Sequence, residues 1–287
     1  MTLRFSQVDV FSSEPLRGNP VAVVHDADGL TDEQMQAFAR WTNLSETTFL
    51  LRPSNADADY RLRIFTPGGE LPFAGHPTLG SAHAWLEAGS TPRGERTEND
   101  RIVQECGTGL VELRERNGRL AFAAPPLRES AAPEPGELDR VAEALRIPRD
   151  SILSARRLDN GPAFLAVRLR DARQVLEVTP DLSAIAALPR PDVGIVGAQP
   201  AATGPDTTAI EVRVFCPNIG VPEDPITGSF NAALAQWLTA DGILPPSYVA
   251  AQGTALGRRG RVHITTEADT IWVGGDTTTT IRGTVEI

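Results

Sequence analysis

The stretch RIFTPGGELPFAGHPTLGSAHAWLEAG, residues 63–89, is written a second time as RVFCPNIGVPEDPITGSFNAALAQWLTA, residues 213–240. Both copies begin with Arg-x-Phe-x-Pro and continue through a turn rich in glycine and proline. Each then reaches a six-residue phrase, HPTLGS at 76–81 and DPITGS at 224–229, in which Pro, Gly and Ser coincide. A repeat about half a chain long predicts two similar lobes with a site between them.

Each copy has the pattern of a strand, a glycine-rich turn and the start of a helix. Apolar and polar residues alternate over 60–64 and 210–214, which is typical of a half-buried strand. Proline at the second position of each phrase suits the first turn of a helix, and apolar residues follow at helical spacing. The first N–H groups of a helix lack partners and lie at the positive end of its dipole. Two such starts facing one cleft predict a carboxylate site, although each copy alone also fits an ordinary strand-to-helix turn.

The composition of the 287-residue chain is that of a globular protein, with 41% hydrophobic and 22% charged residues. The net charge of -10 argues against a nucleic acid or an anionic membrane as partner. Two cysteines without metal-type spacing imply no disulfide framework. The N-terminal residues alternate and carry charge, as in a strand rather than a signal peptide. With no apolar run of roughly 20 residues, we expect a soluble, cytoplasmic protein.

Strands predominate along the chain, and each half contains one well-marked helix. Strands are expected at 4–11, 20–24, 101–106, 110–116 and 163–169, with a hairpin turn at Asn117-Gly118. A capping box formed by Thr31 and Gln34 predicts a helix start. Residues 125–136 read as a connector because they are rich in Pro, Ser and Ala. The pattern predicts an α+β fold, not regular βαβ alternation.

Four residues are candidates for chemistry. Glu46 stands where a helix gives way to a strand, and partial burial there would raise the pKa of its carboxyl toward neutrality. His76 and Asp224 occupy matched positions in the two phrases, and Ser229 closes the second one. Each also has a plainer reading: a surface Glu on an edge strand, a structural His, an N-cap Asp and a capping Ser.

Other kinds of site have little support in the sequence. The four histidines show no metal-ligand spacing, and no Walker A or G-x-G-x-x-G sequence occurs. A Lys Schiff base has no support either, and Ser229 lacks the G-x-S-x-G surroundings of a hydrolase nucleophile. Acid–base chemistry without a metal or an organic cofactor remains as the expectation.

The chain resembles the PhzF (phenazine biosynthesis-like) family, which has the diaminopimelate-epimerase fold. The matching segments extend over nearly the whole chain: GNPVAVV at 18–24, NLSETTF at 43–49, RIFTPGGELPFAGHPTLGSA at 63–82, VPEDPITGS at 221–229 and QGTALGRRGRV at 252–262. The SETTF, GHPT and EDPxTGS phrases are specific in combination, whereas any one of them alone would be weak.

The resemblance implies two pseudosymmetric lobes, each a mixed sheet wrapped around a central helix. We expect an N-terminal lobe at 1–118, joined by the last strand at about 276–287, and a C-terminal lobe at 119–275. The family binds a small carboxylate between the lobes without a cofactor and usually forms homodimers. By resemblance, Glu46 is the proton-shuttling carboxylate, and His76, Asp224 and Ser229 assist it. The resemblance and the helix starts together assign substrate binding to Asn19, Gly75, Thr78, Thr227 and Gly228.

One departure from related enzymes limits the mechanism. Epimerases and racemases of this fold use two cysteines, one from each lobe, on opposite faces of a stereocentre. The equivalent positions here are Ala74 and Thr227, which excludes a two-thiol mechanism. Cys106 and Cys216 lie elsewhere and are expected to be core residues.

The sequence therefore predicts an isomerase that moves a proton between carbons of a small carboxylate. Two alternatives remain open at this point. A one-base amino-acid epimerase would use the same residues but return the proton to the same carbon. A carboxylate-binding protein of the same fold would lack turnover. The substrate itself is not identified, because one fold hosts several chemistries.

Overall fold

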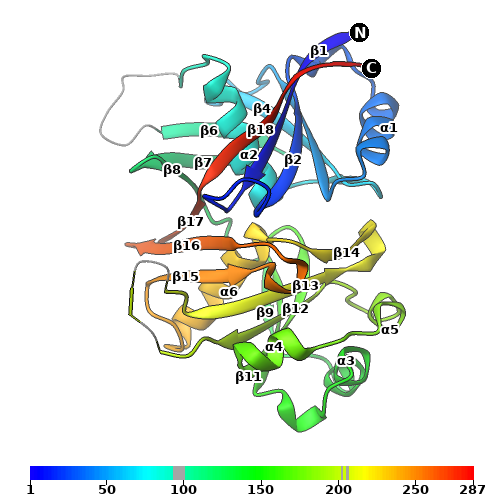
Figure 1. Ribbon diagram of the computed structural model, residues 1–287, viewed down its shortest axis with the longest axis vertical. Helices are drawn as coiled ribbons and strands as arrows, with labels where there is room; N and C mark the ends of the chain where they lie inside the picture. The colour runs from blue at the N-terminus through cyan, green and yellow to red at the C-terminus, as the bar shows by residue number, and fades with distance from the viewer. Residues whose placement is uncertain (93–100, 202, 205–206) are drawn as a thin grey trace. The chain divides into compact units, whose positions relative to one another are not determined.

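The computed structural model describes residues 1–92, 101–201, 203–204 and 207–287. Two compact units divide the chain: unit 1 contains Met1–Ala123 and Trp272–Ile287, and unit 2 contains Ala124–Ile271. Both are α+β units dominated by strands (Figure 1). The sequence-based boundary after Gly118 falls in the turn before a strand that belongs to unit 1, so the compact unit extends to Ala123.

Unit 1 contains a mixed sheet in which the paired strands lie in the order β18-β1-β2-β3-β4-β6-β7-β8-β17. The short strand β5 pairs with β4. The chain ends lie side by side because β1 pairs with β18 over Thr2↔Glu286 to Val10↔Thr277 (Figure 1). The strands are β1 Thr2–Val10, β2 Asn19–Val24, β3 Glu46–Leu51, β4 Tyr60–Phe65, β5 Glu70–Leu71, β6 Arg101–Cys106, β7 Gly109–Arg116, β8 Arg119–Ala123, β17 Thr270–Gly275 and β18 Thr277–Glu286.

Unit 2 repeats this plan with β9-β10-β11-β12-β13-β15-β16 as neighbours and β14 paired to β13. From β10 to β16 the pairings are antiparallel, parallel, antiparallel, parallel and antiparallel, the same succession as from β1 to β7 in unit 1. The duplication in the sequence is therefore a duplication of topology. The strands are β9 Glu129–Ala131, β10 Ser154–Asp159, β11 Ala163–Asp171, β12 Val193–Ala198, β13 Ile210–Cys216, β14 Val221–Asp224, β15 Ser247–Gln252 and β16 Gly260–Glu267.

Each sheet packs on one central helix, α2 (Gly75–Glu87) in unit 1 and α6 (Gly228–Ala240) in unit 2, both 13 residues long. Helix α2 contacts β1, β2, β3, β4, β8 and β18, and most of its residues are buried. Helix α6 is buried over ten of its residues. A helix that is apolar all round belongs in the interior. Close approach requires Gly80, because a Cβ there would lie 2.4 Å from Val21 Cγ1.

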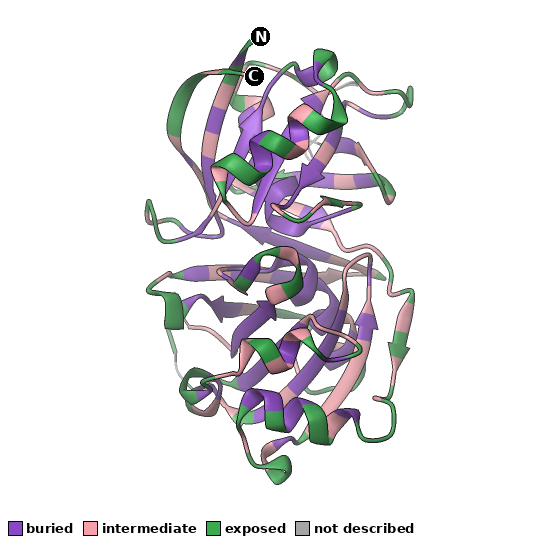
Figure 2. Cartoon of the chain, turned by 90° about the vertical axis from the view of Figure 1, so that its right-hand side faces the viewer, coloured by how far each residue is buried: buried purple, intermediate pink, exposed green. Residues whose placement is uncertain are grey.

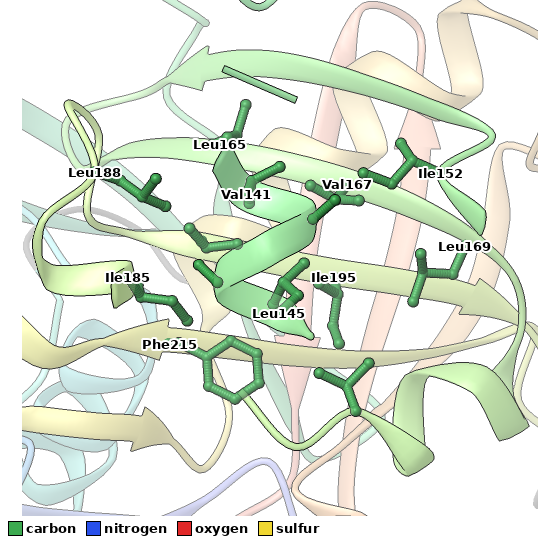
Figure 3. Close-up of a cluster of buried hydrophobic side chains, with 14 of the residues drawn as sticks. Val141, Leu145, Ile152, Leu165, Val167, Leu169, Ile185, Leu188, Ile195 and Phe215 are labelled. Carbon is green, nitrogen blue, oxygen red and sulfur yellow. The ribbon is translucent and has the colours of Figure 1, made fainter. Parts of the chain in front are cut away.

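Outer helices cover the other face of each sheet. In unit 1, α1 (Asp32–Thr42) packs Met35 and Phe38 on the β3 side chain of Phe49. In unit 2, α3 (Glu137–Leu145), α4 (Ala172–Glu177) and α5 (Leu182–Ala186) close a core centred on β11, β12 and β13 (Figure 3). Figure 2 shows that exposed residues concentrate on loops and on the outward sides of such helices. Short 3₁₀ turns occur at Ala27–Gly29, Arg149–Ser151, Pro217–Ile219 and Thr254–Leu256.

Local signals in the sequence are largely confirmed. Thr31 and Gln34 form the capping box of α1, and Asn117-Gly118, both at positive φ, form the hairpin turn between β7 and β8. The connector at 125–136 is more ordered than expected, because it contains β9, which pairs with β10. None of the helices in the described part of the chain is long and apolar enough to cross a membrane.

The alignment of the two repeated phrases needs correction. The phrases place His76 opposite Asp224, but helix α2 starts at Gly75 and helix α6 only at Gly228. The helix starts therefore match Ala74 with Thr227 as N-caps, and His76 with Ser229. Pro225 lies before its helix rather than in the first turn. The similar phrases align incorrectly because the turn before the helix is longer in unit 2. Gly228 comes 15 positions after Arg213, whereas Gly75 comes 12 positions after Arg63.

Asp192, directly before β12, makes the stability of the fold depend on pH. Burial raises the pKa of its carboxyl to about 6, against opposing contacts with Cys216 and Arg190. Its Oδ1 atom has no hydrogen-bond partner among the described residues. A folded-state pKa above the unfolded value of 3.8 gives stability that is present below pH 3.8 and is lost as pH rises through 6.

We expect Asp192→Asn to increase the free energy of unfolding at pH 8 by up to about 3 kcal/mol, because the buried charge is removed. The gain should vanish near pH 3.5, where Asp192 is protonated in both states. Urea unfolding at the two pH values checks this. A gain that is equal at both would show that ionisation of Asp192 is not its cause.

Candidate active site

Glu46 is the first residue of β3 and lies within the sheet of unit 1. It pairs with Val21 of the parallel neighbour β2, and β4 flanks β3 on the other side. The residue is 6% exposed. The reading of Glu46 as a surface residue on an edge strand is therefore wrong. A buried carboxyl close to the start of a central helix is the kind of group that serves in proton transfer.

His76 lies beside Glu46, with 3.4 Å between its Nε2 and Glu46 Oε2. It is the second residue of α2 and is 2% exposed. Its Nδ1 lies 3.1 Å from the side-chain nitrogen of Asn19, whose Oδ1 accepts a hydrogen bond from Ser45 Oγ at 3.2 Å. Nε2 lies near the Glu46 carboxyl but makes no hydrogen bond among the described residues, whereas Nδ1 contacts the amide of Asn19. Three segments of unit 1 thus hold Glu46 and His76 side by side.

The imidazole of His76 is neutral at physiological pH. Burial lowers its pKa from the ordinary 6.5 to about 3, against the opposing effect of a hydrogen bond with the backbone of Pro20. A neutral ring donates one hydrogen bond and accepts another, so it can orient Glu46 without adding a positive charge. His76 is therefore suited to direct the carboxyl rather than to act as an imidazolium acid.

The buried neutral state of His76 predicts loss of stability in acid. A depressed folded-state pKa gives stability that is present above pH 6.5 and is lost as pH falls toward 3. Between pH 7.5 and 4.5 we expect a loss of up to about 3 kcal/mol from this residue. His76→Gln should lose correspondingly less over the same interval. Guanidinium unfolding at both pH values measures the difference, and equal losses in the two proteins would contradict it.

In unit 2, the equivalent region centres on Asp224, Thr227 and the start of α6. Asp224 is the last residue of β14, 7% exposed, and is not an N-cap as a helix-start Asp would be. Thr227 holds the N-cap position, but its hydroxyl bonds Asp224 Oδ2 at 2.7 Å instead of capping the helix. Gly228 and Ser229 are the first two residues of the helix and are buried.

Neither central helix is capped by its N-cap side chain. Ala74 has no side chain able to accept a hydrogen bond, and Thr227 makes no cap bond. The first backbone N–H groups that bond to the N-cap carbonyls are those of Thr78 and Asn231. The N–H groups of Gly75 and His76, and of Gly228 and Ser229, come before them and take no part in the helical hydrogen bonds. Such groups, at the positive end of the dipole, suit a carboxylate ligand.

The hydroxyl of Thr78 is less suited to substrate binding than the sequence suggests. Thr78 is fully buried one turn into α2, and its Oγ1 accepts a hydrogen bond from Gln104 Nε2 at 3.1 Å.

The two cysteines differ in their burial. Cys216 is buried as expected, whereas Cys106 is only partly buried and contacts Thr108. The prediction that both are core residues is right for Cys216 alone.

Buried amide side chains that the sequence analysis did not select support both helix starts. Gln252, at the end of β15, bonds Thr227 and Asn231, and Asn160 donates to the backbone oxygen of Ser229 at 2.9 Å. In unit 1, Gln104 supports Thr78. The Gly-Thr dipeptide that follows both Cys106 and Gln252 is too short a signal to single out these amides.

Comparison with known proteins identifies the relatives of this chain. The family model for phenazine biosynthesis-like proteins matches residues 8–285. Antisense-enhancing sequence 1 of Schizosaccharomyces pombe is 37% identical over 97% of both chains. Trans-2,3-dihydro-3-hydroxyanthranilate isomerase of Pseudomonas aeruginosa is 36% identical over 92% of this chain and 90% of its own. The structure of a predicted epimerase from Pseudomonas aeruginosa superposes with a TM-score of 0.79 at 28% identity, covering 99% of both chains.

The duplicated fold and the similarity to isomerases define the class of protein as an isomerase with a diaminopimelate-epimerase-like fold. Within that class, the chain belongs to the phenazine biosynthesis-like (PhzC-PhzF) family.

Proposed function

We propose that the protein moves a proton between two carbons of a small carboxylate, with Glu46 as the general acid and base. One observation carries the proposal: the buried carboxyl of Glu46 lies 3.4 Å from the imidazole of His76, which burial keeps neutral. Asn19 in turn holds that ring in place. A general base works best when its position and protonation are fixed before the substrate arrives.

In the proposed reaction, the carboxylate of Glu46 removes a proton from a carbon next to unsaturation or a carbonyl. The C–H bond breaks, and its electron pair is delocalised into the neighbouring double bond. The protonated Glu46 then delivers the proton to a second carbon, a new C–H bond forms, and the carboxylate is restored. The neutral ring of His76 stays beside the carboxyl throughout. No electrons leave the substrate, so the step is balanced without an oxidant or reductant.

The substrate carboxylate would be held by helix starts. The N–H groups of Gly75 and His76 form one anion-binding edge, and those of Gly228 and Ser229 form another. We propose that Asp224 and Ser229 assist proton delivery. Support comes from the duplication itself, since the same uncapped helix start occurs in both units.

The chemistry of the substrate follows from the reaction. Transfer of a proton between carbons requires an acidic C–H and a conjugated acceptor carbon in one small molecule. A cyclic dihydro-carboxylate such as the one in the name of the Pseudomonas relative has both. We propose this substrate class for the present chain. An amino-acid epimerase using Glu46 alone is the second candidate, favoured by the epimerase named among the structural relatives.

Proton NMR in D₂O tests the proposal. Trans-2,3-dihydro-3-hydroxyanthranilate and a panel of amino acids would be incubated with the wild-type protein and with Glu46→Gln. Deuterium that enters a new carbon only with the wild type supports isomerisation, whereas deuterium at an α-carbon with inverted chirality supports epimerisation. Tight carboxylate binding without any exchange would overturn the proposal in favour of a binding protein.

A further inference from the structure

Gln252 occupies a buried position in unit 2 where its amide bonds four groups. It is fully buried at the end of β15. Its Oε1 accepts from the backbone N–H of Thr227 at 3.0 Å and from Asn231 Nδ2 at 2.9 Å. Its Nε2 donates to Thr227 Oγ1 at 2.9 Å and to the backbone oxygen of Asp224 at 3.2 Å. Every donor and acceptor of the amide is therefore engaged.

The orientation of this amide is fixed by the backbone. A backbone N–H can only donate, so the atom that faces Thr227 N is the amide oxygen. A backbone carbonyl can only accept, so the atom that faces Asp224 O is the amide nitrogen. Asn231 is fixed in the same way, because its Nδ2 also donates to the backbone oxygen of Thr227 at 3.0 Å. Rotation of Gln252 by 180° would set its NH₂ group against two donors, Thr227 N–H and Asn231 Nδ2, and its oxygen against the backbone oxygen of Asp224.

The fixed amide determines the direction of the Thr227 hydroxyl. Its oxygen accepts a hydrogen bond from Gln252 Nε2, so its single proton is directed to Asp224 Oδ2, 2.7 Å away. A hydrogen bond to a carboxylate of this length is a strong one. The hydroxyl of Thr227 thus donates to Asp224 in a direction that is set by Gln252, a side chain from a different strand.

We propose that Gln252 is a positioning residue that acts through the hydroxyl of Thr227 to fix the carboxylate of Asp224 for the reaction. This inference rests on the proposed function, in which Asp224 assists proton delivery. It also changes the expected role of Thr227, which serves the carboxylate of Asp224 rather than the substrate. Chains of hydrogen bonds that are satisfied throughout hold a site in one geometry.

Two isosteric substitutions test the relay by steady-state kinetics with trans-2,3-dihydro-3-hydroxyanthranilate. Thr227→Val removes the relaying hydroxyl and should lower kcat about 10- to 100-fold with little change in KM, as expected for loss of a hydrogen bond to a charged group. Thr227→Ser should restore most of the turnover. Gln252→Glu keeps both acceptor contacts but accepts from Thr227 instead of donating, so it should lower kcat similarly.

Gln236 in α6, which is partly buried, provides a control with similar hydrogen bonds. Its amide likewise accepts from a backbone N–H, of Leu127, and donates to backbone oxygens, of Pro125 and Ala232. Gln236→Glu places the same new charge in the same unit without touching Asp224, and kcat should be unchanged. Equal losses in Gln252→Glu and Gln236→Glu would assign the effect to stability and overturn the relay, as would full activity in Thr227→Val.

A substrate-free measurement separates failure of the relay from failure of the proposed function. Three-bond NMR couplings to the Thr227 methyl group report its χ1 rotamer. A single rotamer in the wild type and averaging in Gln252→Leu support the relay even if the wild type does not process this substrate. A fixed rotamer in Gln252→Leu overturns the relay, even if deuterium exchange confirms the proposed reaction.

Discussion

Glu46→Gln should lower turnover by about 10²- to 10⁴-fold, the contribution of a positioned general acid or base. The substitution keeps the size of the side chain. Only the ability to take and return a proton is lost. Because the residue is buried and contacts His76 at 3.4 Å, an isosteric change should leave the fold and substrate affinity nearly intact.

The measurement is kcat for the isomerisation, followed together with deuterium exchange in D₂O. Glu112→Gln in β7 is a suitable control, since its side chain is 41% exposed and pairs with Arg101. It should behave as wild type. A Glu46→Gln protein with a near-normal rate would remove Glu46 from the mechanism, whatever the activity of other variants.

Phe230→Ala should destabilise the protein by about 3–5 kcal/mol, the cost of truncating a fully buried aromatic side chain. Phe230 is the third residue of α6 and is 0% exposed. Its ring meets Phe164 of β11 edge-on at 5.1 Å, and it lies against Gly194 of β12, where a Cβ would come within 2.5 Å of three ring carbons. The ring of Phe230 therefore packs the start of α6 against β11 and β12.

A double-mutant cycle makes this prediction specific. Gly194→Ala should be destabilising alone, because the new methyl group overlaps the ring. In the Phe230→Ala background, the same change should cost much less, since the space is vacant. Urea unfolding of the four proteins gives the coupling energy. Additive costs would show that Phe230 and Gly194 do not share the packing that the structure assigns to them.

The fold was predictable from the sequence to a large extent because its signals are local or repeated. Alternation marked the strands, a capping box marked α1, and Asn117-Gly118 marked a hairpin. The repeated stretch revealed the duplication, which the pairing order of the two sheets bears out. Glu46 and His76 were selected as candidates, and the structure places them in contact.

The limits of the prediction also have physical causes. Identical letters aligned HPTLGS with DPITGS, but a helix begins where its backbone hydrogen bonds begin, and that point shifts when the preceding turn lengthens. The protonation of His76 depends on how completely water is excluded from it, and burial is a property of the packed chain.

The sequence by itself determined the two-lobed α+β plan, the family and the acid–base candidates, because strand alternation, caps and repeated phrases are read along the chain. The tertiary structure alone decided that Glu46 is buried inside a sheet, that His76 is neutral, and that Gln252 directs the Thr227 hydroxyl to Asp224. These features need side chains brought together from distant strands and helices, and such contacts leave no periodic pattern in the sequence.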